Sequence, residues 1–265
     1  MSQLQIPQIK DLKEKGFTLN SNWLNEQEII FLKKIILSMQ RQKGDKRSHL
    51  PFKKSQIFLK LIQAQLQDIK LGLYLYNLSK KLKLIDISNS FFEKESELVN
   101  IDYYVSKKSN EPVLDWHVDK AYSGKENVSK FVKADDYGLK FIFYLTDVSF
   151  ENGCLNYIPY SNKVAFALKK AIYKNEINYS PYWKMKDFLN LIMKNKKIVL
   201  KYVRESIFEK FILNMEHLKS NEQVENFSNK IDKGGAIIFD ESGIHKGTAP
   251  SFNDRIIFRY IFKKK

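Results

Sequence analysis

Two residues near the middle of the chain have the types and spacing of metal ligands. His117 and Asp119 are two positions apart, and residues 98–105, shortly before them, have the β-branched and aromatic composition of a strand. In an extended chain, side chains two positions apart point to the same face. An imidazole nitrogen and a carboxylate oxygen would then converge, as two-thirds of the 2-His-1-carboxylate triad that suits non-haem Fe(II). Taken alone, however, such a pair is more often just two polar residues at a strand end.

A third ligand and a basic partner follow near the C-terminus. His245 lies in a polar loop between two apolar segments, residues 234–239 and 255–262, and Arg255 begins the second of them. A guanidinium is a planar fork that stays charged at any working pH and binds a carboxylate through two hydrogen bonds. A metal triad with an arginine therefore suits a dicarboxylic co-substrate, which chelates the metal at one end and meets the guanidinium at the other. Arg259, on the same face of the expected strand, is the alternative for this role.

The segment between these motifs adds a resemblance. Residues 151–163 read ENGCLNYIPYSNK, and residues 15–29 read KGFTLNSNWLNEQEI. In the order His-x-Asp, ENGCL, His and Arg, the chain resembles the phytanoyl-CoA dioxygenase family of Fe(II)- and 2-oxoglutarate-dependent oxygenases. The family's stretch is Glu-Asn-Gly-x-Leu-x-x-x-Pro-Gly-Ser-His-Lys, and here Tyr160 and Asn162 replace its Gly and His. Residues 15–29 are similar to its first strand and helix, so the resemblance is scattered from about residue 15 to residue 262.

The resemblance implies an activity and a set of ligands. It implies that His117, Asp119 and His245 are catalytic and hold Fe(II). It also implies that 2-oxoglutarate and O2 are co-substrates and that succinate and CO2 are released. The substrate would be a small-molecule or carrier-linked metabolite that is hydroxylated at an unactivated C–H bond. Because related halogenating enzymes carry a small residue in place of the carboxylate, Asp119 favours hydroxylation over halogenation.

The contacts to 2-oxoglutarate are less complete in the sequence. The resemblance assigns the far carboxylate to Arg255. Many relatives carry Ser or Thr two residues later, whereas this chain has Ile257. A second hydrogen-bond donor must therefore come from elsewhere in the chain. The residues that we expect to supply it are Thr248, Tyr104 and Lys140.

The implied fold is α+β and β-rich: a double-stranded β-helix, or cupin-like jelly roll, with the active site in its mouth. The residues by themselves indicate only N-terminal helices and a β-rich second half. We expect one oxygenase domain over residues 1–265, with an N-terminal strand and helices in 15–90 and the jelly-roll core in 92–262. A helical insertion at 163–230 precedes the strand that leads to His245, and this position makes it a candidate lid over the metal.

Periodicity predicts the main elements. Residues 21–42 have apolar side chains at helical spacing, and Ser21 or Asn22 is a suitable N-cap. Residues 139–146 alternate imperfectly, which suits a strand buried on both faces. The other predicted helices are residues 55–82, 163–174, 182–194 and 205–219, and the aromatic residues expected in the candidate lid are Tyr179, Tyr182 and Trp183.

Composition and charge bear on the substrate, on the location and on other classes of function. Lys and Arg number 45 against 30 Asp and Glu, a formal net charge of +15. This charge favours an acidic or phosphorylated substrate, although AT-rich codon usage explains it as well, and a basic nucleic-acid-binding protein is a weaker alternative. No apolar run reaches 18 residues, no signal peptide is recognisable, and the single cysteine is Cys154, so we expect a cytoplasmic protein without a transmembrane segment. A catalytically silent metal- or ligand-binding jelly roll is the other alternative, and the oligomeric state is not predicted.

Overall fold

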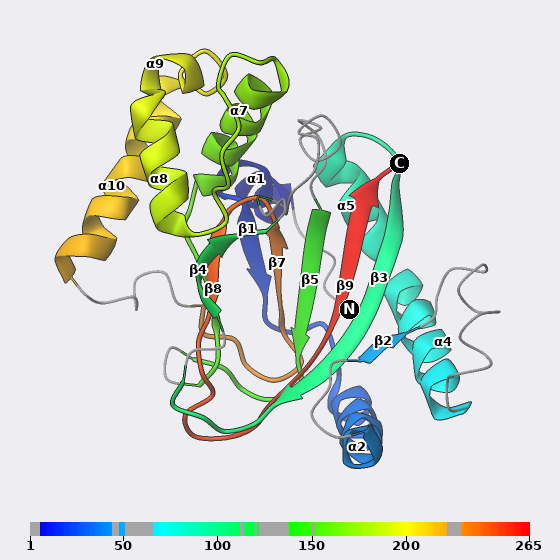
Figure 1. The fold of residues 1–265 in the computed structure, drawn as a ribbon. Coiled ribbons are helices and arrows are strands. Elements are labelled where there is room, and N and C mark those ends of the chain that lie inside the picture. Colours follow the sequence, from blue (N-terminus) through cyan, green and yellow to red (C-terminus); the bar gives the residue numbers. More distant parts are fainter. Residues whose placement is uncertain are drawn as a thin grey trace.

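Two antiparallel β-sheets face each other in the computed structural model, which describes residues 6–43, 48–50, 66–111, 114–119, 121, 138–149, 152–221 and 229–265 (Figure 1). The large sheet has the strand order β1-β7-β5-β9-β3-β2 and the small sheet the order β4-β8-β6. This arrangement is the double-stranded β-helix that the resemblance implies. The strands are β1 (Phe17–Asn20), β2 (Ser48–Leu50), β3 (Ser96–Ser106), β4 (Leu114–Val118), β5 (Gly138–Tyr144), β6 (Leu155–Tyr157), β7 (Ala236–Asp240), β8 (Ile244–Gly247) and β9 (Arg255–Lys264).

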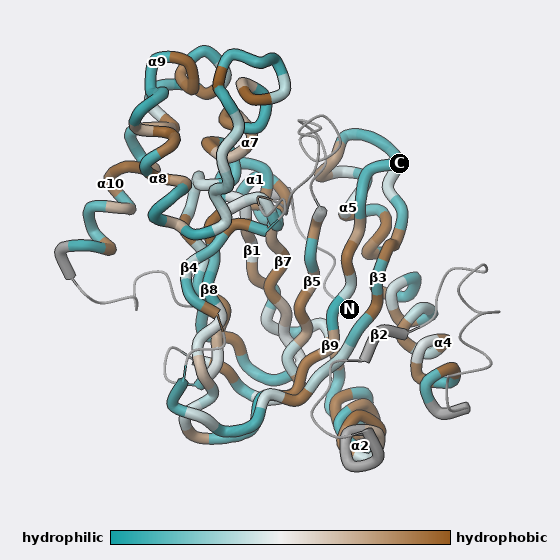
Figure 2. The backbone as a smooth tube through the Cα atoms, in the orientation of Figure 1, coloured by the Kyte–Doolittle hydropathy of each residue, from teal (hydrophilic) through white to brown (hydrophobic). Residues whose placement is uncertain are grey.

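Alternation along the strands of the large sheet separates two environments. On β5, Phe141 and Phe143 pack in a core on the helix-covered face, whereas Ile142 and Tyr144 point toward the small sheet. All seven residues of β5 are buried, so the prediction of a strand covered on both faces is confirmed. In Figure 2, β7 is largely hydrophobic, whereas β5 and β9 combine hydrophobic and hydrophilic residues. The sequence period of two thus decides which side chains can reach the space between the sheets.

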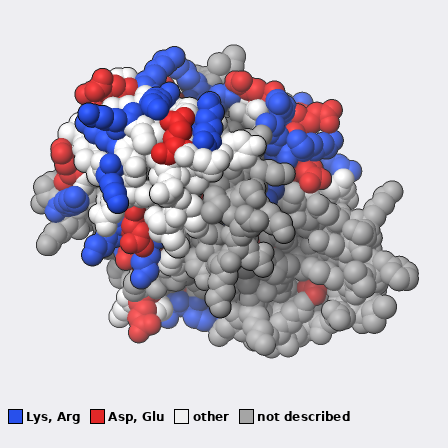
Figure 3. All heavy atoms as spheres, turned by 45° about the horizontal axis from the view of Figure 1, so that its top comes forward, with Lys and Arg blue, Asp and Glu red and all other residues white. Residues whose placement is uncertain are grey.

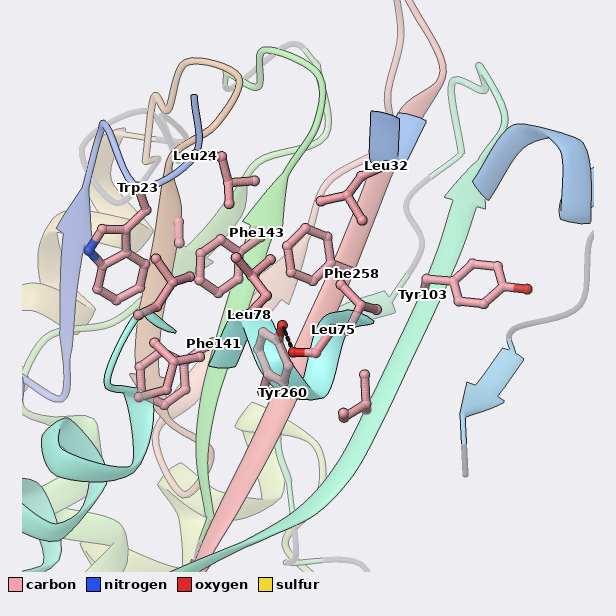
Figure 4. Packing of buried hydrophobic residues seen from close by; sticks show 14 of the residues in the cluster. Trp23, Leu24, Leu32, Leu75, Leu78, Tyr103, Phe141, Phe143, Phe258 and Tyr260 are labelled. Atoms are coloured by element: carbon pink, nitrogen blue, oxygen red, sulfur yellow. Dashed lines mark hydrogen bonds between the residues drawn. The ribbon is translucent and has the colours of Figure 1, made fainter. Parts of the chain in front are cut away.

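Helices from the N-terminal part cover the outer face of the large sheet. Trp23 stacks on Phe143 with ring centroids 5.2 Å apart, and Phe143 stacks on Phe258 at 4.8 Å (Figure 4). The hydroxyl of Tyr260 donates to the Leu75 carbonyl at 2.7 Å, so this buried polar group is satisfied. The helices are α1 (Ile6–Lys15), α2 (Glu26–Lys43), α4 (Leu66–Lys81), α5 (Leu84–Phe92), α7 (Ser161–Tyr173), α8 (Met185–Lys194), α9 (Lys196–Val199) and α10 (Glu205–Asn221).

The start of α2 differs from the prediction. The helix begins at Glu26, and Asn25 caps it: the Glu28 amide donates to Asn25 Oδ1 at 2.9 Å and the Asn25 amide donates to Glu28 Oε2 at 3.0 Å. The prediction of a cap at Ser21 or Asn22 is wrong because a distant carbonyl holds the next segment out of the helix. The amides of residues 23 and 24 both donate to the carbonyl of residue 234, at 3.1 and 3.0 Å.

Other N-terminal elements also shift from their predicted positions. Of the predicted helix at residues 55–82, the structure describes α4 from Leu66, and residues 51–65 lie outside the described part. Helices α1 and α5 were not predicted. Because α5 extends to Phe92, the strand predicted from residue 92 onward, β3, begins at Ser96.

Helices α7 to α10 cover the outer face of the small sheet (Figure 1). Trp116, Val118 and Ile244 from the small sheet share a buried cluster with Phe188 and Phe211 from α8 and α10. The three helices predicted between residues 163 and 219 are confirmed as α7, α8 and α10, although α8 begins three residues later than predicted. Their bulk therefore lies behind the small sheet, away from the space between the sheets.

The charged surface of the helices is mixed. Lys and Arg alternate with Asp and Glu on the face shown in Figure 3. Several lysines are paired with carboxylates, such as Lys201 with Glu176 at 2.8 Å and Lys13 with Glu93 at 2.8 Å. On this face, acidic side chains interrupt the described basic ones, whereas nucleic-acid binding requires a continuous basic face. None of the described helices is both long and apolar enough to span a bilayer.

Candidate active site

The pairing of β4 with β8 brings the two predicted histidine ligands together. His117 and His245 are directly opposite each other across this strand pair, with ring centroids 4.4 Å apart. Asp119 lies in the turn after β4, with its Oδ1 3.7 Å from His117 Nε2 and its Oδ2 3.3 Å from His245 Nε2. One ligand atom from each of the three residues lies within 4.8 Å of the others. The structure thus assembles the set of donors that the sequence suggested.

Backbone hydrogen bonds prepare both imidazoles to bind a metal. Nδ1 of His117 lies 2.7 Å from the carbonyl of residue 115, and Nδ1 of His245 lies 2.9 Å from the carbonyl of residue 243. A carbonyl can only accept, so each Nδ1 carries the proton. In each ring it is therefore Nε2 that faces Asp119 and is available to a metal. Such bonds fix the tautomer and the orientation of metal-binding histidines.

The protonation states fit the same role. Burial, together with the neighbouring His245, lowers the pKa of His117 to about 4, so its imidazole is neutral at physiological pH. Burial alone would raise the pKa of Asp119, but His245 and the Lys140 ammonium outweigh it and hold this pKa well below its usual range. A neutral imidazole at His117 and an ionised carboxylate at Asp119 are the forms of these groups that bind a divalent cation.

A cavity of about 290 Å³ lies between the two sheets at this point. Its walls combine the three predicted metal ligands with apolar and cationic side chains of the large sheet. Its lining residues are Tyr104, Leu114, His117, Asp119, Lys140, Ile142, Tyr144, Leu155, Phe239, His245, Gly247, Arg255, Ile257 and Arg259.

The described hydrogen bonds of Arg255 in this cavity all go to neutral groups. Its guanidinium donates to the Gly153 carbonyl at 2.6 Å and to Ser106 Oγ at 2.9 Å, and its Nε has no hydrogen-bond partner among the described residues. The residue is only 4% exposed. A buried cation with an unused donor is suited to an anionic ligand, because no carboxylate among the described residues neutralises it.

Arg259, the alternative, is already neutralised. Its Nε and Nη2 donate to the two oxygens of Asp102 at 2.6 and 2.8 Å, and Asp102 is fully buried. This bidentate pair has the strong geometry that a guanidinium would otherwise form with a ligand carboxylate. The contacts therefore favour Arg255 over Arg259 for the far carboxylate of a co-substrate.

The three residues expected as additional contacts are placed differently. Tyr104 lines the cavity with its ring centroid 5.9 Å from the Arg255 guanidinium carbon. Lys140 also lines the cavity, but its ammonium pairs with Asp119 and lies 3.5 Å from Glu241. Thr248 is not among the lining residues, and its hydroxyl donates to the Cys154 carbonyl at 3.0 Å. The structure thus brings Tyr104 and Lys140 to the site and leaves Thr248 outside it.

Sequence reasoning missed the partners that support these residues. Asp102, Ser106 and Glu241 have no motif of their own, and each contacts a cavity residue from another part of the chain. A signal was present at Asp102, which is a carboxylate inside a strand otherwise rich in apolar residues. An acidic residue at a buried strand position requires a cationic partner.

In the described part of the candidate lid, the segment just before α8 is the part that contacts the site. No residue of α7 to α10 lines the cavity. The amide of Val118 donates to the Trp183 carbonyl at 2.9 Å, and the Trp183 ring lies 5.4 Å from that of His117. Tyr182 is buried and packs on Phe188. Of the three aromatics expected in the lid, Trp183 is therefore the one beside the metal ligands, and closure over the site remains a prediction.

Comparison with known proteins agrees with this geometry. Among solved structures, the non-heme alpha ketoglutarate dependent carbocyclase SnoK from nogalamycin biosynthesis has a TM-score of 0.58 at 14% identity, over 98% of this chain and 84% of the other. EctD from S. alaskensis has a TM-score of 0.58 at 11% identity, over 98% of this chain and 77% of the other. EvdO2 from Micromonospora carbonacea var. aurantiaca has a TM-score of 0.56 at 11% identity, over 99% of this chain and 92% of the other. At such identities these likenesses establish the fold. No curated protein matches the sequence.

The sequence profile of phytanoyl-CoA dioxygenase (PhyH) matches residues 31–251. The fold and the site define a jelly-roll oxygenase, and the chain belongs to the phytanoyl-CoA dioxygenase family. It is a non-haem iron oxygenase, with Fe(II) as cofactor and 2-oxoglutarate and O2 as co-substrates. The residues present fit these groups: two Nε2 atoms and a carboxylate suit Fe(II), and the unused Nε of Arg255 suits an anion.

The Arg259 pair predicts a stability effect that is separate from co-substrate binding. Arg259→Ala is expected to lower the free energy of unfolding by about 3–5 kcal/mol, because it leaves the Asp102 carboxylate buried without its guanidinium. Urea denaturation measures this loss, and a double variant with Asp102→Asn should recover part of it. A well-folded Arg259→Ala protein that no longer binds 2-oxoglutarate would reverse the assignment of the two arginines.

Proposed function

We propose that this chain hydroxylates a small organic substrate, free or linked to a carrier, at a C–H bond beside an Fe(II) held by His117, Asp119 and His245. The observation that carries the proposal is the convergence of two imidazoles and a carboxylate within 4.8 Å, in a cavity that they share with Arg255. A facial set of three ligands leaves positions open for a co-substrate and O2.

The residues of the chain have distinct tasks in this proposal. When bound, Fe(II) and 2-oxoglutarate supply the activation of O2, with release of succinate and CO2. The carbonyls of residues 115 and 243 keep the two imidazoles oriented toward Asp119. Arg255 would bind the far carboxylate of 2-oxoglutarate through Nε, whereas its Nη atoms remain on Gly153 and Ser106. The co-substrate is thereby held at both ends before O2 reacts.

Hydroxylation is the outcome that the ligand set favours. Asp119 supplies a carboxylate where a halide would need an open position, and Lys140 pairs with that carboxylate. A halide would need the place that this carboxylate would take at the metal, so hydroxylation is favoured over halogenation.

The cavity limits what reaches the metal. Its volume of about 290 Å³ is at the lower end of the range of about 300–1,000 Å³ that is usual for ligand pockets. We infer that it accepts 2-oxoglutarate together with the reacting end of the substrate. The remainder of a larger or carrier-linked substrate would stay outside, near Leu114 at the exposed edge of the small sheet.

Anaerobic titration of the metal-free protein with Fe(II) and 2-oxoglutarate tests this function. We expect a visible metal-to-ligand charge-transfer band that requires both additions, because the keto oxygen and adjacent carboxylate of 2-oxoglutarate chelate the iron. Admission of O2 should then release succinate. If the folded protein gives no band, the oxygenase proposal fails and a catalytically silent jelly roll replaces it.

A further inference from the structure

A buried lysine connects the large sheet to the metal-binding carboxylate. The Lys140 ammonium pairs with Asp119 Oδ2 and lies 3.5 Å from Glu241 Oε2. The side chains of Lys140 and Glu241 are 9% and 3% exposed, and that of Asp119 is 27% exposed. Lysine is rarely buried to this extent unless it is paired. Here one ammonium is placed between two carboxylates, one of which is a predicted metal ligand.

The two residues that face Asp119 from the other side, Lys140 and Glu241, lie on and directly after two paired strands inside the large sheet. Lys140 is on β5, in the middle of the large sheet, and Glu241 directly follows β7. The two strands are paired, and the Glu241 amide donates to the Gly138 carbonyl at 3.0 Å. Asp119, by contrast, lies in the turn beyond the end of β4, on the other sheet. The ion pair therefore ties a carboxylate in a turn to a fixed point on the opposite sheet.

We propose that Lys140, backed by Glu241, is a positioning residue that holds the Asp119 carboxylate toward His117 and His245. This inference rests on the proposed function and assigns Lys140 a role other than contact with 2-oxoglutarate. Its ammonium already bonds to carboxylates of the chain, whereas Arg255 bonds only to the neutral Gly153 carbonyl and Ser106 hydroxyl among its described contacts. Groups that orient a metal-binding carboxylate typically affect metal affinity about 10–100-fold.

A purely electrostatic effect of Lys140 on the metal and a positioning effect on Asp119 predict opposite changes in metal affinity for Lys140→Met, so an experiment can separate them. An ammonium near the metal repels it, and a nearby carboxylate attracts it. If Lys140 acted only through its charge, Lys140→Met would strengthen metal binding, Glu241→Gln would weaken it, and the double variant would cancel the two changes. If Lys140 positions Asp119, Lys140→Met weakens binding and the charge-balanced double variant is equally weak. Glu241→Gln, which leaves Lys140 on Asp119, changes the affinity little.

Binding of Co(II) alone to the full-length, metal-free protein measures these effects. Isothermal titration and the visible absorption of bound Co(II) are recorded for wild type, Lys140→Met, Glu241→Gln and the double variant, with His245→Ala as the reference for loss of a ligand. We expect the Kd for Co(II) to rise about 10–100-fold in Lys140→Met and in the double variant, with an altered Co(II) spectrum. In Glu241→Gln we expect this Kd to change less than about threefold. Circular dichroism checks folding. If Lys140→Met does not fold because Glu241 loses its ion pair, the Kd of the double variant for Co(II) is the measurement that tests the inference.

Two results would overturn the inference while sparing the proposed function. One is a double variant that binds Co(II) like wild type. The other is a Lys140→Met protein with unchanged Co(II) binding but a raised Kd for 2-oxoglutarate, measured with Co(II) bound. That result would mean that Lys140 contacts the co-substrate. If wild type itself binds no Co(II) in a way that depends on His245, the proposed metal site fails, and Lys140 has no ligand to position.

Discussion

Arg255→Ala is expected to raise the Kd for 2-oxoglutarate at least about 30-fold, because truncation of one partner of a buried charge pair costs about 2 kcal/mol or more. Arg255 is 4% exposed, and none of the described hydrogen bonds of its guanidinium goes to a carboxylate of the chain. Without it, the far carboxylate of 2-oxoglutarate would be buried without a counter-charge. The charge-transfer band of the anaerobic Fe(II) complex reports the Kd directly.

Arg255→Lys is the matched control for this prediction. A lysine keeps the charge but lacks the planar fork, so it should recover only part of the affinity. Binding of the metal alone should be unchanged in both variants, since Arg255 contacts Gly153 and Ser106 rather than a metal ligand. An unaltered Kd for 2-oxoglutarate in a folded Arg255→Ala protein would show that another residue binds the far carboxylate.

His245→Ala is expected to weaken metal binding more than about 100-fold and to abolish succinate release. Loss of a direct ligand must exceed the 10–100-fold effect of the groups that only orient ligands. His245 also faces His117 across the strand pair and approaches Asp119, so its removal leaves two donors, which cannot form the facial set. Equilibrium binding of Co(II) and single-turnover release of succinate measure the two effects.

His217 provides the control for this substitution. It lies on α10, in an exposed position, and is no part of the donor set. His217→Ala should therefore bind metal and release succinate like wild type. Asp119→Gly should resemble His245→Ala in both measurements, and turnover retained in Asp119→Gly would remove this carboxylate from the metal site.

Local pattern predicted the elements that bear the site. The β-branched composition of residues 98–105 predicted β3, and the doubly buried stretch at 139–146 predicted β5. The spacing of two between His117 and Asp119 placed them on one side of the chain, and their ligand atoms do converge. These features depend on neighbours along the chain, which is why periodicity captures them.

The errors have a shared physical origin. The N-cap of α2 was misplaced because a carbonyl at residue 234, far away in sequence, binds the amides of residues 23 and 24. The position of helices α7 to α10 behind the small sheet depends on which apolar face they share, and Trp116 and Ile244 supply that face. Periodicity shows that a helix has an apolar side, but it does not show which surface will cover that side.

By itself, the sequence determined the donor types, their order and the strands and helices that carry them. Only the tertiary structure decided which partners these side chains have. The pairing of β4 with β8 placed His117 opposite His245. Buried Asp102 pairs with Arg259, whereas the Nε of Arg255 has no hydrogen-bond partner among the described residues. The packing of β5 against β7 directed Lys140 to Asp119 and Glu241. Each of these contacts joins segments that are distant along the chain, so it depends on how the sheets assemble and not on local composition.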